Sequence, residues 1–484
     1  MKHRMAIAAA LAITLSAAAQ YNETNNLFYH AFRTPQSTDL NPAFFPNRNT
    51  VYLRLPGIGM QFGSPVSISD MAYVEGDTAT IIDVNNILDA LTDNNRIRFG
   101  ADIDLFGFGF KVRNLFFNFN TRMVNSLSVG LPVSTVNALR NGNVDDSGNP
   151  IGTVNIVSGD LFNAQSYLEM GLGAGYRIEP INLTVGARAK VLYGIANAQT
   201  DNTYAELVTD DNYERMKVNI YYELQTSTAM PPDPLTSRIE AVKDLLNLGT
   251  ANAGLSFDIG ARYDMGPFSF SAAINDLSAG IHWRKNIMRV VPESGPITLE
   301  FDGADVSTLI NGGQINTDSI VQSYNDMLAG LVPYTVDDGD GYWFSVPTKI
   351  NLGASYSFAR FFRAGLLLHG QFDRGLLSKK NARELDLSGD VLNTFRFNTT
   401  ASVGVNLFNW LEVMVGSSMV YDGSKMDFLN PGAGIVLTPF TAVQIYVMAD
   451  YVSSIYLTEA KAFNMKFGIN MLFGKGGGSR IAQN

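Results

Sequence analysis

The residue types that most often carry catalysis or bind metals are scarce and scattered in this chain. It has no cysteine, and His30, His282 and His369 are too widely spaced to offer a metal-ligand pair. No Gly-x-Ser-x-Gly nucleophile turn appears. The acidic run 337–341 lacks the later glutamate of an EF-hand loop. We therefore predict no catalytic residue, no metal site and no cofactor, and we expect that the protein is not an enzyme.

Basic residues are the remaining candidates for chemistry. They recur on what we predict below to be the inward, polar face of long strands: Arg177, Arg188, Lys190, Arg262, Arg284, Arg363 and Arg396. Acids share that face: Glu169, Asp258, Asp264, Glu412 and Asp450. Two interpretations stay open. In the first, the basic and acidic side chains pair across the lumen and hold a plug or the wall. In the second, the basic side chains line a passage for a ligand with an anionic head such as a carboxylate.

Composition excludes several classes of protein. Only 17% of the 484 residues are charged and 11% are aromatic, which is unlike a disordered chain. The net charge of −10 gives no support to nucleic-acid binding, which needs a basic face. We expect no nucleic-acid partner.

The first nineteen residues have the pattern of a signal peptide. Lys2 and Arg4 precede the apolar stretch 5–15, and small residues follow at 17–19. The apolar stretch is too short to span a bilayer as a helix. We predict Sec-dependent export, removal of residues 1–19, and no helical membrane anchor.

Strict alternation of apolar and polar residues recurs along the chain, as in 253–264, 344–358 and 395–408. These runs are longer than the strands of soluble proteins and match the 9–11 residues of a tilted membrane strand. Their second face is polar and rich in glycine, as expected for the lumen of a barrel. We predict an all-β fold: a transmembrane antiparallel β-barrel over residues 50–473, located in the outer membrane.

Short connections alternate with long ones, which indicates short periplasmic turns and long extracellular loops. Segment 267–290 is expected to be one long strand, and 196–251 one excursion with a hairpin at 218–222 and a helix from Ser237. If the hairpin crosses the membrane, the strand count is sixteen. Otherwise it is about fourteen, at roughly 50–62, 97–110, 113–125, 166–178, 181–195, 252–264, 267–290, 344–358, 361–372, 395–408, 410–421, 432–438, 441–452 and 462–473.

The end of the chain and its loops indicate partners. The last strand is apolar on one face and contains Phe467 and Phe473, a pattern that resembles the signal read by the barrel-assembly machinery. A tail, 474–484, follows it. The loop 291–343 has nine acids and no base, which fits either divalent ions bridging it to lipopolysaccharide or a solvated rim. The barrel surface would contact outer-membrane lipid.

The segment 20–49 precedes the first strand and is polar, rich in asparagine and without periodicity. It contains Asn41, Pro42 and Ala43, and its prolines oppose regular structure. It is longer than a periplasmic tail requires, and a fourteen-stranded lumen needs filling. We predict that this segment is a plug inside the barrel, and the alternative is a free periplasmic tail.

The sequence resembles the FadL/PorV-type outer-membrane barrels. That superfamily has fourteen strands, a plugging N-terminal segment and an Asn-Pro-Ala motif before the first strand, matched by Asn41, Pro42 and Ala43. More closely, it resembles a family of such barrels from Bacteroidota whose function is not established. The resemblance covers nearly the whole chain, in stretches such as 107–111, 183–190, 347–349 and 464–474.

In FadL-type barrels the plug contacts a kinked strand that opens sideways into the membrane. The best kink candidates here are Asn275, Asp276 and Gly280, inside the predicted strand 267–290. The kinked strand of the fatty-acid transporters is the third, so their gate does not transfer directly to this chain.

Three classes of function follow. The first is passive, FadL-like passage of a small hydrophobic or amphipathic molecule through a plugged lumen, with Arg188 and Arg262 facing its polar end. The second is a PorV-like interaction barrel in an outer-membrane secretion or assembly complex. The third is an outer-membrane hydrolase that uses His282 or His369.

Overall fold

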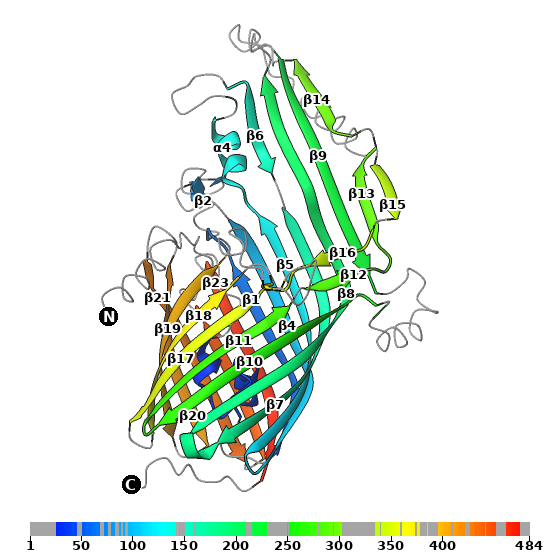
Figure 1. Ribbon diagram of the computed structural model, residues 1–484. Helices are drawn as coiled ribbons and strands as arrows, with labels where there is room; N and C mark the ends of the chain where they lie inside the picture. Colours follow the sequence, from blue (N-terminus) through cyan, green and yellow to red (C-terminus); the bar gives the residue numbers. More distant parts are fainter. Residues whose placement is uncertain are drawn as a thin grey trace, which may run out of the picture.

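The computed structural model is dominated by one large β-barrel (Figure 1). The structure describes residues 26–45, 51–67, 72–75, 79–82, 87–88, 91, 95–141, 143, 151–158, 161–209, 215–229, 249, 251–278, 280–293, 295–302, 334–338, 340–358, 361–372, 375–377, 385, 395–407, 410–421, 426–440, 442–451 and 461–474. The predicted signal peptide 1–19 and nearly all of the tail 474–484 lie outside these residues. No helix within them is long and apolar enough to cross a membrane.

Fourteen antiparallel strands of the described part of the chain close the barrel. Closure occurs where β1 pairs with β23 on one side and with β4 on the other. The predicted fold class and strand count are thus confirmed. The barrel strands are β1 (Val51–Gly63), β4 (Arg96–Val112), β5 (Leu115–Gly130), β7 (Phe162–Ile178), β8 (Leu183–Thr209), β10 (Ala253–Met265), β11 (Phe268–Ser278), β17 (Lys349–Phe358), β18 (Phe362–Gln371), β19 (Arg396–Leu407), β20 (Leu411–Tyr421), β21 (Met426–Phe440), β22 (Val443–Asp450) and β23 (Ala462–Phe473).

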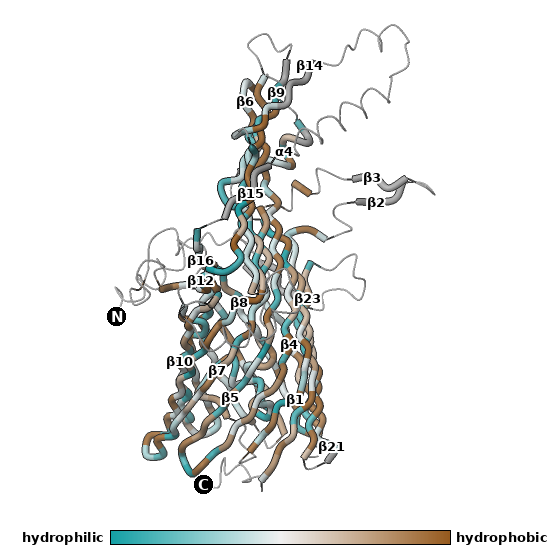
Figure 2. The backbone as a smooth tube through the Cα atoms, turned by 90° about the vertical axis from the view of Figure 1, so that its right-hand side faces the viewer, coloured by the Kyte–Doolittle hydropathy of each residue, from teal (hydrophilic) through white to brown (hydrophobic). Residues whose placement is uncertain are grey.

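Alternate side chains of each strand face outward and inward, because the side-chain period of a strand is two. On β10, Leu255 and Phe257 are 55% and 45% exposed, whereas Ser256 and Asp258 are fully buried. Apolar and polar residues alternate in this way along the barrel strands (Figure 2). The outer wall is therefore an apolar surface suited to lipid, and the inner wall is polar.

Short turns gather at one end of the barrel. One is the 3₁₀ turn η3 (Glu179–Ile181) between β7 and β8, and another is the two-residue link after Met265, where Gly266 has φ +58°. Exposed aromatic side chains surround this end: Phe358, Phe361, Phe362 and Trp410. Such a girdle is typical of the boundary between hydrocarbon and headgroups.

At the other end, β8 continues well beyond the barrel. The strand predicted at 181–195 runs on to Thr209 and forms a long hairpin with β9 (Arg215–Thr228). The hairpin stands above the barrel (Figure 1) and is not one of the fourteen strands that close it, which excludes the sixteen-strand alternative. The helix predicted from Ser237 falls outside the described residues.

Further elements attach to this hairpin. β6 (Thr153–Ser158) pairs with β8, β13 (Met288–Pro292) and β14 (Ile297–Asp302) pair with β9, and β15 (Tyr334–Asp338) pairs with β13. The helix α4 (Val133–Asn141) lies beside β6. We call the part of β8 beyond Ile195, together with β9, β6, β13, β14 and β15, the arm. A separate small hairpin, β2 (Ala72–Glu75) with β3 (Ala79–Ile82), belongs to another long loop.

The single strand predicted at 267–290 was wrong. β11 ends at Ser278, and the chain then forms the short β12 (Ile281–Trp283), which pairs with β16 (Tyr342–Phe344). The break coincides with two residues of positive φ, Asp276 at +58° and Gly280 at +104°. Asp276 lies where the pairing of β11 with β10 shifts register and just after the last residue that pairs with β17, and Gly280 follows the end of the strand. Such φ values do not continue a regular strand.

Candidate functional site

The segment 26–45 lies inside the barrel, where nearly all of its side chains are buried (Figure 1). It contains two short 3₁₀ turns, η1 (Asn26–His30) and η2 (Pro35–Asp39), and otherwise has no regular structure. Such a segment leaves most of its backbone polar groups without partners of its own, and buried groups of this kind must be satisfied elsewhere.

Side chains of the barrel wall supply those partners. Arg363 Nη1 donates to the His30 carbonyl at 2.9 Å, and Arg188 Nη2 donates to the Thr38 carbonyl at 2.7 Å. Amides of Asn275, Asn351 and Gln444 donate to the carbonyls of Asp39, Leu40 and Arg33 at 3.2, 3.0 and 3.1 Å. The inner wall is therefore matched to the path of this one segment.

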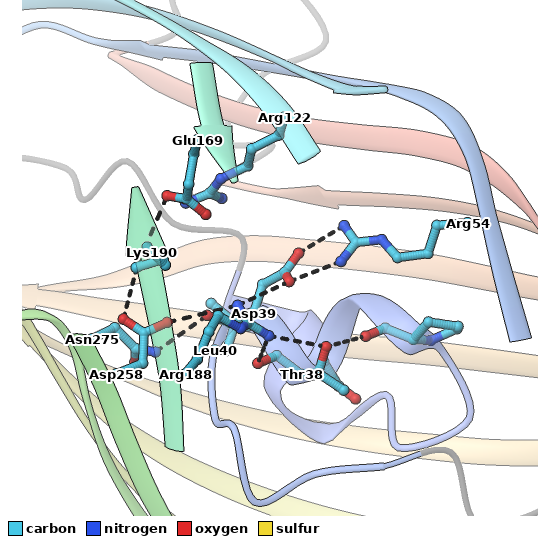
Figure 3. A network of polar contacts seen from close by, with 12 residues as sticks. Thr38, Asp39, Leu40, Arg54, Arg122, Glu169, Arg188, Lys190, Asp258 and Asn275 are labelled. Atoms are coloured by element: carbon cyan, nitrogen blue, oxygen red, sulfur yellow. Dashed lines mark hydrogen bonds and ion pairs between the residues drawn. The ribbon is translucent and has the colours of Figure 1, made fainter. Parts of the chain in front are cut away.

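Asp39 forms the tightest polar contact between the segment and the wall (Figure 3). Its two carboxylate oxygens accept from Arg54 Nη1 and Nη2 at 2.8 and 2.7 Å, and Arg188 Nη1 lies 3.3 Å from Oδ1. Burial favours the neutral acid, but Arg54 and Arg188 outweigh it and hold the pKa of Asp39 below its ordinary value. Asp39 thus stays ionised between two buried guanidinium groups.

The remaining charges of this region pair within the wall. Arg54 Nη2 also contacts Asp104 at 2.9 Å, and Lys466 reaches the same carboxylate at 3.1 Å. A neighbouring cluster joins Lys190 to Asp258 at 2.7 Å and to Asp276. Buried charges require such partners, since an unpaired ion in the interior costs several kcal/mol.

The Asn41–Ala43 turn lies on two glycines of the wall. A Cβ built on Gly186 would lie 2.1 Å from the Pro42 carbonyl oxygen, and one built on Gly260 would lie 2.1 Å from Asn41 Oδ1. Asn41 Oδ1 accepts from the Ala43 backbone N–H at 2.9 Å, and Asn41 Nδ2 donates to the Ala272 carbonyl at 3.3 Å. Only glycine leaves room for the backbone at these two wall positions.

Aromatic contacts fill the space beside this turn. The guanidinium carbons of Arg262 and Arg363 lie 4.6 and 4.8 Å from the centre of the Phe32 ring. His30 packs against Gly365, and neither of its ring nitrogens has a hydrogen-bond partner among the described residues. Burial, together with nearby Arg363, lowers the pKa of His30 to about 3, so its imidazole is neutral.

A cavity of about 700 Å³ lies above the segment, toward the long loops. Its floor is formed by Phe28, Gln36, Asp39 and Leu40 of the segment. Its walls include the loop-side ends of β4, β5 and β7, and β16 lines one side. At the opposite end, Phe45 packs with Tyr52, Phe116 and Leu472 near the short turns. The segment thus lies between residues that line the cavity and residues near the short turns.

The structure brings most of the sequence-predicted residues together and separates a few. Arg188, Arg262 and Arg363 contact the segment, and Lys190 pairs with acids of the wall. Arg396 lines the cavity. Phe467 and Phe473 face outward on β23.

Arg177 and Arg284 lie apart from the segment. Arg177 pairs with Asp264 near the short turns and is 36% exposed in its side chain. Arg284 does not lie on the inner wall, because β11 ends before it. Its side chain is exposed and donates to His282 Nδ1 and to the Gly249 carbonyl.

Sequence reasoning missed Asp39, Arg54, Asp104, Gly186 and Gly260. In the alternating pattern of β1, Arg54 lies on the other face of the strand from its neighbour Leu53, and this was a usable signal that the charge points inward. Nothing local marked the other four as partners of the segment. Among the described residues, no group of three or more His, Asp or Glu is arranged to hold a metal ion.

The chain is similar to one described protein family and to several solved structures. A family model described as "Family of unknown function (DUF5723)" matches residues 42–450. No curated protein matches the chain. Among solved structures, a Pseudomonas aeruginosa FadL homologue is 10% identical, with 94% of this chain and 99% of that chain covered and a TM-score of 0.43. The Ralstonia pickettii toluene transporter TbuX is 9% identical, with 91% of this chain and 94% of that chain covered and a TM-score of 0.42. A deltaS2S3 mutant of the monoaromatic hydrocarbon channel TodX is 10% identical, with 94% of this chain and 95% of that chain covered and a TM-score of 0.41.

Proposed function

We propose that this chain, which belongs to the family of unknown function DUF5723, is an outer-membrane barrel for passive passage of a small amphipathic molecule. In this proposal the segment 26–45 is a plug that closes the lumen. The observation that carries it is the position of the segment, which is buried in the lumen beneath a cavity of about 700 Å³.

The contacts of the segment favour a plug that can leave its seat. They are hydrogen bonds, ion pairs and apolar contacts between side chains, together with hydrogen bonds from Asn41 to wall carbonyls, and the segment adds no strand to the barrel sheet. Displacing it would therefore leave the fourteen-stranded wall closed. The buried charges that it would uncover, such as Arg188, retain a wall acid as partner at 3.6 Å in Asp258.

Planar-bilayer conductance in KCl tests the plug. The intact chain is expected to conduct poorly, and a variant without residues 26–45 is expected to show a large, steady conductance. Uptake of carboxyfluorescein, an amphipathic dye that does not cross bilayers, would report passage into liposomes. Equal conductance of the two proteins would overturn the plug, and uptake by the intact chain no faster than by empty liposomes would overturn passage.

A second candidate is an interaction barrel that docks a protein partner. The arm favours it, because a sheet extending beyond the membrane is not needed for passage through the lumen. A detergent pull-down with the intact chain would recover a stoichiometric partner, and a variant lacking the arm hairpin would lose it. Recovery of the barrel alone would count against this second candidate.

A further inference from the structure

The cavity above the segment has a lining that is unusual for a hydrocarbon site. Eleven of its lining residues are asparagine or glutamine, and serines and a threonine add hydroxyl groups. Pockets for apolar ligands are lined mainly by apolar and aromatic side chains with few polar groups. An apolar ligand in this cavity would strip water from many amides, and each amide left unpaired would oppose binding.

The charged groups of the lining already have protein partners. Lys349 lies 3.4 Å from Asp276, and Arg122 lies 2.9 Å from Glu169. Lys466 pairs with Asp104. An anionic ligand would have to break such pairs, and removing one partner of a buried pair is strongly unfavourable. The lining therefore favours a ligand without net charge.

Three of the amides that line the cavity are nearly fully buried in the wall. Gln165, Gln371 and Asn464 are 9%, 1% and 3% exposed. Each has one buried side-chain atom with no hydrogen-bond partner among the described residues: Gln165 Oε1, Gln371 Oε1 and Asn464 Nδ2. The exposed amide and hydroxyl groups of the lining offer both donors and acceptors, and a ligand hydroxyl group can pair with either kind.

Aromatic rings complete one side of the cavity. β16 contributes Tyr342, Trp343 and Phe344 to the lining. Tyr342 is fixed by donating to Asn197 Oδ1 at 2.7 Å, and the Trp343 ring stacks on His282 with centroids 4.6 Å apart. Fixed aromatic rings beside amides suit a sugar ring, which has apolar C–H faces and a rim of hydroxyl groups.

From these features we infer that the cavity binds a neutral, hydroxyl-rich ligand of the saccharide class, either free or as the head of an amphipathic molecule. The volume of about 700 Å³ lies within the range of small-molecule sites and accommodates a short saccharide. This inference deepens the proposed function by naming the polar group that the lumen would recognise. It concerns binding, so it can be tested without passage.

Tryptophan fluorescence of the full chain, in a detergent without a sugar head, tests the inference because Trp343 lines the cavity. The probes are maltose, cellobiose and N,N′-diacetylchitobiose, with decanoate for comparison. We expect a saturable change with at least one disaccharide, and weaker or no binding of decanoate. Absence of saturation with all three disaccharides, or tighter binding of decanoate, would overturn the inference.

Matched variants assign the binding to the cavity. Asn464→Leu and Gln371→Leu should each raise the Kd of the bound disaccharide about tenfold or more, which corresponds to about 1.4 kcal/mol. Asn120→Leu is the control, because Asn120 is an equally buried amide of the inner wall that does not line the cavity. An equal loss in Asn120→Leu would contradict the assignment, provided that all variants migrate as folded barrels in unheated gels.

The two proposals can fail separately. If the chain binds a disaccharide but deletion of the plug does not change the conductance, the proposed function is wrong and the saccharide site stands. If the plug controls the conductance but the protein binds decanoate and none of the disaccharides, the proposed function stands and the saccharide site is wrong.

Discussion

Gly186 on β8 and Gly260 on β10 lie directly opposite each other in the barrel wall, and the Asn41–Ala43 turn lies on both. The pair forms a flat patch of backbone in a wall that otherwise projects side chains. This patch explains how a turn can approach the sheet closely enough for Asn41 Nδ2 to reach the Ala261 and Ala272 carbonyls at 3.4 and 3.3 Å.

Gly186→Ala should unseat the Asn41–Ala43 turn. The new Cβ would lie 2.1 Å from the Pro42 carbonyl oxygen, and overpacking of this kind typically costs about 1–3 kcal/mol. We expect the KCl conductance to rise toward that of the variant without residues 26–45. Gly404→Ala is the control, since its Cβ would meet Met414 at an ordinary 3.6 Å and conductance should not change. A conductance of Gly186→Ala equal to that of the unmodified chain would argue against this seat.

Asp39→Asn should release the segment by leaving Arg54 and Arg188 without its charge. Loss of one partner of a buried ion pair typically costs about 3–5 kcal/mol. Limited proteolysis with chymotrypsin, which cleaves after aromatic residues such as Phe44, should become faster. Arg177→Gln removes a pair that is 36% exposed, and its effect should be at most about 1 kcal/mol. If both variants resist proteolysis as well as the unmodified chain, Asp39 does not hold the segment.

Mild acid should weaken the seating of the segment through His30. Its pKa is about 3 when seated and 6.5 when released, so only the released form takes up a proton as pH falls below 6.5. Taken by itself, the titration of His30 leaves the seating unaffected above pH 7 and weakens it by about 2 kcal/mol at pH 5. The Asp39 carboxylate adds no loss in this window, because its ordinary pKa is 3.8.

Conductance measured between pH 8 and pH 5 checks this expectation. The conductance of the unmodified chain should increase relative to that of His30→Gln as the pH falls, because glutamine does not titrate and the two chains share every other titratable group. A curve of the same steepness in His30→Gln would assign the pH dependence to another group.

Removal of the arm hairpin should leave the barrel folded. The barrel part of β8 pairs with β7 and β10, and only residues beyond Ile195 pair with β9. A variant with 200–224 replaced by a short turn should keep the slow unfolding of a closed barrel, measured as altered migration of unheated samples in denaturing gels. Loss of that behaviour would show that the arm contributes to closure.

The sequence alone determined the barrel and the direction of most side chains along its strands, and it narrowed the number of strands to about fourteen or sixteen. These features follow from a period of two and from turn residues, which are local properties that one strand reveals by itself. The strand from Ala462 to Phe473 was predicted with its observed limits for this reason. Kink candidates were identified at Asn275, Asp276 and Gly280, but the end of β11 at Ser278 was not predicted, because an alternating pattern does not show that the backbone leaves the sheet there.

Only the tertiary structure decided which inward residues meet the N-terminal segment. Gly186 and Gly260 become neighbours through the register of two strands, and Asp39 reaches Arg54 and Arg188 through the path of a segment with no periodicity. Register across a closed barrel depends on the stagger of all its strands together. A list of inward bases could therefore be written from the sequence, but the partner of each base could not.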